Sequence, residues 1–130
     1  MQLMTKELEA KFKQYPIGSQ DGLRGNAKVV AKYFNPMGAG TWFITEAEKQ
    51  ENGDYMMYGY GNLGDSDLAE FGYIMLSQLQ EIKLPFGMTI ERDLYLPKDC
   101  TLIDAMRRTG MQIPAVLLEN EESEEEEEEY

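Results

Sequence analysis

Residues 41–60 read TWFITEAEKQENGDYMMYGY, and this stretch decides the fold. Its first part, Thr41–Glu46, and its last part, Tyr55–Tyr60, are both rich in the β-branched and aromatic side chains that are typical of strands. Between them stands the pair Asn52-Gly53, which tolerates the positive φ angles of a type I′ turn. The sequence therefore predicts a β-hairpin. Its two strands must be antiparallel, because the connection is too short for a parallel crossover.

Three further segments extend this hairpin into a sheet. Residues 27–34 have strand composition and end at a run of turn-forming residues, residues 68–74 alternate weakly, and residues 90–96 alternate apolar and polar side chains before Pro97. We predict an antiparallel meander of four to five strands, built from residues 27–34, 41–48, 54–60, 68–74 and 90–96.

Short helices flank the predicted strands. Thr5 is a good N-cap for a helix over residues 6–14, and Thr101 is a good N-cap for a last helix that Gly110 ends. Ser77 and Gln80 match a capping box that opens a helix to about residue 83. We expect these helices to pack on one face of the sheet, which gives an α+β fold.

The chain divides into one globular domain, residues 1–118, and an acidic low-complexity tail, residues 119–130. Nine of the 24 acidic residues lie in that tail, which leaves 15 acidic against 12 basic residues in the domain. Clustered glutamates repel one another and bury nothing, so we expect a disordered tail. Met111–Leu118 is expected to dock on the domain as its last ordered piece, and the glycine-rich stretch Gly18–Asn26 to be a mobile loop.

The composition excludes several chemistries. The chain has no histidine and a single cysteine, Cys100, so it cannot form a catalytic triad with an imidazole base, a cysteine–histidine zinc site or a disulfide within one chain. Cys100 is expected to be structural. The N-terminus lacks the apolar run of a signal peptide, and no apolar segment is long enough to span a bilayer. We expect a soluble cytoplasmic protein without a membrane partner, because a lone cysteine suits a reducing compartment.

Several motifs, taken in order, resemble those of one protein family. They are Thr41–Glu46, Glu70–Tyr73, Ser77 with Leu79, Pro85–Met88 and Ile90–Leu94. In this order the motifs resemble the DUF2958 family, small bacterial proteins of uncharacterised function that are often encoded on mobile genetic elements. The similarity runs from about Leu3 to Pro97. The resemblance implies an intracellular α+β domain, and it implies no reaction, cofactor or catalytic residue.

Acidic residues supply the candidates for chemistry. Asp65, Asp67 and Glu70 follow a glycine-rich stretch, and hard cations prefer such gathered oxygen ligands, although the spacing differs from that of an EF-hand. The alternative is a solvated acidic loop. Glu91 and Asp93 would share one face of a strand, either as an acid–base pair or as part of a charged cross-strand ladder.

Glu46 ends its predicted strand. It would pair there with Glu91 for acid–base work or meet Lys28 or Lys32 instead. The sequence leaves these alternatives open.

Aromatic side chains gather in the meander, where Tyr58 and Tyr60 share one face. One sheet face is expected to be core and the other a contact surface. The interaction candidates are Tyr58, Tyr60, Glu46, Glu91 and Asp93.

Two hypotheses about function follow. The first is a noncatalytic protein-interaction module, linked to mobile elements, that needs no cofactor and binds an unidentified protein. In a sharper version the acidic chain mimics DNA and inhibits a nucleic-acid-binding protein. Direct nucleic-acid binding is not expected, since the domain is net negative. The second is a small carboxylate-dependent or divalent-metal-dependent enzyme, which would require three of the carboxylates to converge in one cleft.

Overall fold

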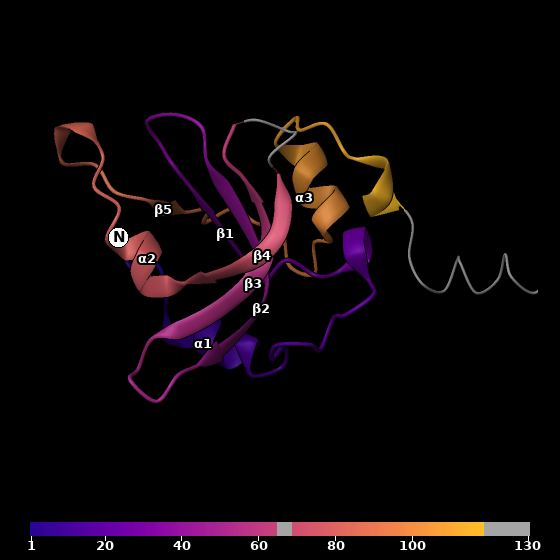
Figure 1. The fold of residues 1–130 in the computed structure, drawn as a ribbon, viewed down its shortest axis with the longest axis horizontal. Coiled ribbons are helices and arrows are strands. Elements are labelled where there is room, and N and C mark those ends of the chain that lie inside the picture. Colours follow the sequence, from indigo (N-terminus) through magenta and orange to yellow (C-terminus); the bar gives the residue numbers. More distant parts are fainter. Residues whose placement is uncertain (65–68, 119–130) are drawn as a thin grey trace, which may run out of the picture.

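Five strands form a single antiparallel sheet in the computed structural model, which describes residues 1–64 and 69–118 (Figure 1). Their order in the sheet is β4-β3-β2-β1-β5. The strands are β1 (Ala31–Phe34), β2 (Thr41–Lys49), β3 (Tyr55–Asn62), β4 (Glu70–Met75) and β5 (Glu91–Arg92). The first four strands form the predicted meander, and β5 pairs with the outer edge of β1. The prediction of an α+β fold with an antiparallel sheet is confirmed.

The predicted hairpin joins β2 to β3, but its turn differs from the expected one. Gly53 N donates to Gln50 O at 3.0 Å, and Gln50 N donates to Asp54 O at 2.7 Å. Gly53 has a φ of 87°, whereas Asn52 is not among the residues with positive φ. The turn therefore spans four residues and needs only one left-handed residue, which glycine supplies. Asn52 uses its side-chain oxygen to accept a hydrogen bond from Asp54 N instead.

Two predicted strands are shorter than expected because other groups take their hydrogen bonds. Residues 27–29 lie next to the start of the last helix, where Val29 N donates to Cys100 O and Leu102 N donates to Ala27 O. After β5 the chain turns, because the Asp93 carboxylate accepts a hydrogen bond from Tyr95 N.

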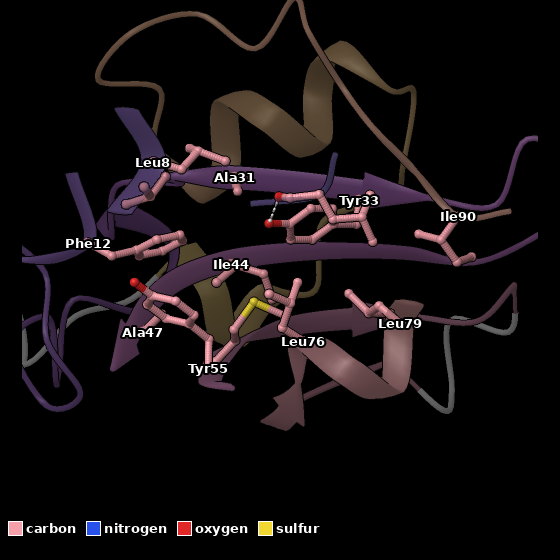
Figure 2. Packing of buried hydrophobic residues seen from close by; sticks show 13 residues of the cluster. Leu8, Phe12, Ala31, Tyr33, Ile44, Ala47, Tyr55, Leu76, Leu79 and Ile90 are labelled. Atoms are coloured by element: carbon pink, nitrogen blue, oxygen red, sulfur yellow. Dashed lines mark hydrogen bonds between the residues drawn. The ribbon is translucent and has the colours of Figure 1, made fainter. Parts of the chain in front are cut away.

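Helices cover both faces of the sheet, so the expectation of a single covered face was wrong. The helices are α1 (Lys6–Phe12), α2 (Leu76–Gln80) and α3 (Leu102–Arg108), with short 3₁₀ turns η1 (Arg24–Asn26), η3 (Pro85–Gly87) and η4 (Ala115–Leu118). On one face α1 and α2 pack on a first hydrophobic cluster that includes Tyr33, Ile44 and Met57 (Figure 2). On the other face α3 and η4 pack on a second cluster around Phe43 and Tyr60. Apolar side chains alternate along the strands to both faces of the sheet, so each face needs helices to shield it from water.

The helix caps agree with the sequence at two of three places. Thr5 and Thr101 cap α1 and α3 through their hydroxyls, as predicted. The predicted cap at Ser77 was wrong, because the N-cap of α2 is Met75, two residues earlier, where Gln78 Oε1 accepts a hydrogen bond from Met75 N. The Ser77 hydroxyl donates to Asp54 instead.

The C-terminal segment docks on the domain as predicted. Leu117 is 1% exposed in the second cluster. The predicted acidic tail lies outside the described residues. Within residues 1–64 and 69–118, no helix is both long and apolar enough to cross a membrane.

Candidate interaction site

A buried carboxylate holds the segment that the sequence predicted to be a mobile loop. Glu46 is 2% exposed, and its two oxygens accept hydrogen bonds from Gly18 N at 2.7 Å and Gln20 N at 3.0 Å. The Gln20 side chain in turn donates to Thr45 O and Lys28 O and accepts from Lys28 N. Residues 18–20 are therefore fixed to β2, and the expectation of a mobile loop was wrong for this part of the chain.

Among the described acidic candidates, Glu91 and Asp93 lie apart from Glu46. Glu91 on β5 lies level with Phe34 on β1, which lies level with Thr41 on β2. Glu46 is five residues further along β2 than Thr41, which is about 16 Å at the rise of a strand. The two carboxylates therefore do not pair for acid–base work. Asp93 forms a salt bridge to Lys32 at 3.3 Å, which agrees with a charged cross-strand contact.

The candidate metal ligands are only partly described. Glu70 is exposed at the start of β4, while Asp65 and Asp67 lie outside the described residues. Among the residues that the structure does describe, no three acidic or cysteine side chains are grouped so that they could hold a metal ion.

An aromatic row crosses β3 and β4 on the face of the second cluster. Tyr58 pairs with Tyr73 at a ring-centroid distance of 4.9 Å and stacks on Phe71 at 5.9 Å, and Tyr60 meets Phe71 at 5.3 Å. Burial raises the pKa of the Tyr58 and Tyr60 hydroxyls above the ordinary value. Tyr60 is only 4% exposed and packs in the second cluster, whereas Glu46 is 2% exposed and lies at the wall of a hollow described below. Tyr73, by contrast, is 63% exposed.

The strand β4 is an edge of the sheet, and the hydrogen bonds around it show which peptide groups point outward. The carbonyl of Tyr58 accepts from Thr45 Oγ1 on β2, so the peptide groups of Tyr58 face away from β4. Tyr73 pairs with Tyr58, and its own N–H and C=O must therefore point away from β3. By alternation the same holds for Phe71. The N–H of Met75, which would also point outward, is taken by Gln78 Oε1.

Two hollows flank β4, one on each face of the sheet. On the face of the second cluster, a hollow of about 320 Å³ is lined by residues that include Asp21, Arg24, Glu46, Tyr58 and Phe71; we call it the acidic pocket. On the opposite face, a hollow of about 240 Å³ is lined by residues that include Trp42, Ile44, Gly61, Gly72 and Ile74; we call it the tryptophan groove. The edge strand thus separates two sites that differ in chemistry.

Another exposed aromatic side chain lies at the tip of a small turn. Phe86 is 92% exposed on η3, between the paired residues Lys83 and Thr89. It lines neither hollow beside β4. This isolated side chain makes a useful control position.

Tyr58 and Glu70 were candidates from the sequence, whereas Asp21, Phe71 and Gly72 were not predicted to be part of this site. One signal was available. Residues 70–75 contain no proline, lysine or arginine, the residues with which edge strands are commonly protected.

Comparison with known proteins gives one match. A family described as "Protein of unknown function (DUF2958)" matches residues 3–111, which is most of the chain. No curated protein and no solved structure gives a match.

Proposed function

The chain belongs to the DUF2958 family, whose description assigns no activity, and we propose that it is a noncatalytic protein-interaction module that binds an extended segment of a partner protein along β4. An extended segment adds to a sheet edge through main-chain hydrogen bonds, and its alternate side chains enter flanking pockets.

One observation carries this proposal: Phe71 and Tyr73 direct their peptide N–H and C=O groups outward, and within the described residues no hydrogen bond reaches these groups. A regular edge strand without proline, lysine or arginine is a template for strand pairing. The opposite edge differs, because β5 is two residues long and is followed by the Lys32–Asp93 salt bridge. The site is therefore at β4 rather than at β5.

The wider setting of this function is also part of the proposal. The lone Cys100 supports a cytoplasmic location, and the resemblance of the sequence motifs to a family that is often encoded on mobile elements supports a role in their biology. The version in which the protein mimics DNA depends on the glutamates of the tail, outside the described residues, and it predicts partner binding that weakens steeply with added salt. The alternative of a metal-dependent enzyme depends on Asp65 and Asp67, which also lie outside the described residues.

The test uses peptides selected from a random phage-displayed library against the full chain. We expect selected peptides to slow hydrogen exchange at the amides of Phe71 and Tyr73. The amides of Gly72 and Ile74, which face β3 by alternation, should change little.

A proline at an outward-facing N–H of an edge strand removes a donor without breaking the sheet ladder. Tyr73→Pro should therefore abolish binding while the circular dichroism spectrum stays native. Phe86→Ala is the control for the loss of a distant exposed aromatic side chain, because the positive φ of 61° at this residue excludes proline. Selected peptides that bind Tyr73→Pro as tightly as the parent chain, or a library that yields no binding peptide, would contradict the proposal.

A further inference from the structure

We infer that the segment bound at β4 alternates a basic side chain, which enters the acidic pocket, with apolar side chains, which enter the tryptophan groove. This inference rests on the proposed function of β4 and specifies the chemistry of the partner. It follows from the two hollows that flank the edge.

Alternation along a strand gives each side chain of an added segment a defined face. In β4 itself, Phe71 lines the acidic pocket, whereas Gly72 and Ile74 line the tryptophan groove. An added strand continues the same pleat at a spacing of about 4.8 Å. Every second side chain of the bound segment therefore faces the acidic pocket, and the intervening ones face the tryptophan groove.

The charges around the acidic pocket favour a cation. Within residues 1–64 and 69–118, its lining includes the carboxylates of Asp21 and Glu46 and the guanidinium of Arg24. After burial, the negative charge of Glu46 is the largest cause of the raised pKa of Tyr58, and Asp21 adds to it, so the phenol lies in a negative potential. Tyr58 lines the pocket and contacts the ring of Tyr73 on β4 at a centroid distance of 4.9 Å, so the two rings offer faces on which a guanidinium stacks.

The side chain that fits this path is long. The strand β3, which carries Tyr58, lies about 10 Å from an added strand. Arginine and lysine extend furthest across this gap, because their aliphatic stem packs on the apolar surface of β4 while their charged end points towards Tyr58. The pocket therefore matches a basic side chain better than a short polar one.

The tryptophan groove offers apolar contact and free space. A Cβ added at Gly72 would meet no atom within 4 Å, so the floor of the groove beside the edge is open. Trp42, Ile44 and Ile74 line it, and among the described residues of its lining Glu70 alone is acidic. An aliphatic side chain from the added segment buries its surface here, at about 25 cal/mol for each Å² removed from water.

A second copy of this chain is a poorer occupant of the edge. Residues 70–75 contain one charged residue, Glu70, and no basic residue, so a neighbouring β4 would bring no cation to the acidic pocket. The chain also has a net charge of -12, which opposes self-association. The charges thus favour a different, basic partner.

The test uses a synthetic peptide, acetyl-Ser-Thr-Val-Arg-Val-Thr-Val-Ser-amide, and a companion in which the neutral isostere citrulline replaces arginine. Calorimetric titration of the full chain at low salt should give about tenfold tighter binding of the arginine peptide, the order expected of one charge-assisted contact. Asp21→Asn should reduce this preference and leave the affinity for the citrulline peptide unchanged. Asp99→Asn, at an exposed aspartate outside the pocket, is the matched control.

The groove has its own variant. Gly72→Leu places a side chain in the open space and should weaken both peptides alike, by about tenfold for an excluded valine.

The outcomes separate this inference from the function on which it rests. If both peptides bind equally and Tyr73→Pro abolishes both, the edge binds extended segments but the inferred basic specificity is wrong. If neither synthetic peptide binds while phage-selected peptides protect Phe71 and Tyr73, the inference is again wrong and the proposed function stands. If no peptide of either kind binds, or sedimentation shows a dimer that Tyr73→Pro dissociates, both are overturned.

Discussion

Replacing Glu46 with glutamine tests whether this carboxylate holds residues 18–20 on the sheet. The carboxylate is 2% exposed and accepts one N–H on each oxygen, from Gly18 and Gln20. A glutamine side chain has one oxygen that can accept from one of these two N–H groups, and its NH₂ group, a donor, would face the other N–H without forming a hydrogen bond. The loss of one charge-assisted hydrogen bond and the unsatisfied N–H together should cost about 2 to 4 kcal/mol.

Urea unfolding followed by fluorescence is the assay, because Trp42 is the single tryptophan of the chain. For a domain of this size the loss corresponds to a midpoint lower by about 1 to 2 M. Glu48→Gln is the matched control on the same strand, since Glu48 is exposed and should change stability by less than about 0.5 kcal/mol. Hydrogen exchange at the Gly18 and Gln20 amides should accelerate only in Glu46→Gln. Equal midpoints for the two variants, with unchanged exchange, would refute this account of the loop.

Four further outcomes are expected. Phe43→Ala should cost about 3 to 5 kcal/mol in urea unfolding, because Phe43 is 0% exposed in the second cluster, and an unchanged midpoint would mean that this face is not core. The hydrogen bond from the Ser77 hydroxyl lowers the pKa of Asp54 below its ordinary 3.8, so the stability that this carboxylate adds is present above pH 3.8 and is lost as the pH falls below it. Asp54→Asn should therefore flatten the acid side of the plot of unfolding free energy against pH, and an unchanged plot would exclude a stabilising role for the Asp54 charge. A chain that ends at residue 118 should keep the urea midpoint of the full chain. A chain that ends at residue 114 loses the buried Leu117 side chain, so its unfolding free energy should fall by about 1.5 to 3 kcal/mol. Equal midpoints for the two truncated chains would show that Leu117 adds no stability. Burial raises the pKa of the Cys100 thiol, so iodoacetamide at pH 8 should modify the folded chain far more slowly than the urea-unfolded chain, and equal rates would contradict its burial.

Local features of this fold were predictable from the sequence, and features set by distant contacts were not. The β2–β3 hairpin and the caps at Thr5 and Thr101 depend on groups within a few residues, and they were confirmed. The cap at Ser77 failed because Asp54, 23 positions earlier, accepts its hydroxyl. The loop at residues 18–20 was mistaken for a mobile one because its anchor, Glu46, lies more than 25 positions later.

The candidate site shows the same limit. Alternation correctly placed Tyr58 and Tyr60 on one face of the sheet, but it could not show that Tyr60 is covered by the second cluster. The identity of the open edge depends on where β5 pairs. If β5 paired with β4 instead of β1, Tyr73 would lie on an inner strand of the sheet. The sequence of residues 90–96 does not predict which of these two strands β5 pairs with.

The pairing of β5 with β1 has a consequence for folding during synthesis on the ribosome. Phe34 leaves the ribosome early, but its partner Glu91 is translated 57 positions later. At typical elongation rates of 5 to 20 residues per second, the outer side of β1 waits about 3 to 11 s for its neighbour. The nascent chain therefore passes through a stage in which the meander has two open sides, and translation closes one of them while β4 remains open.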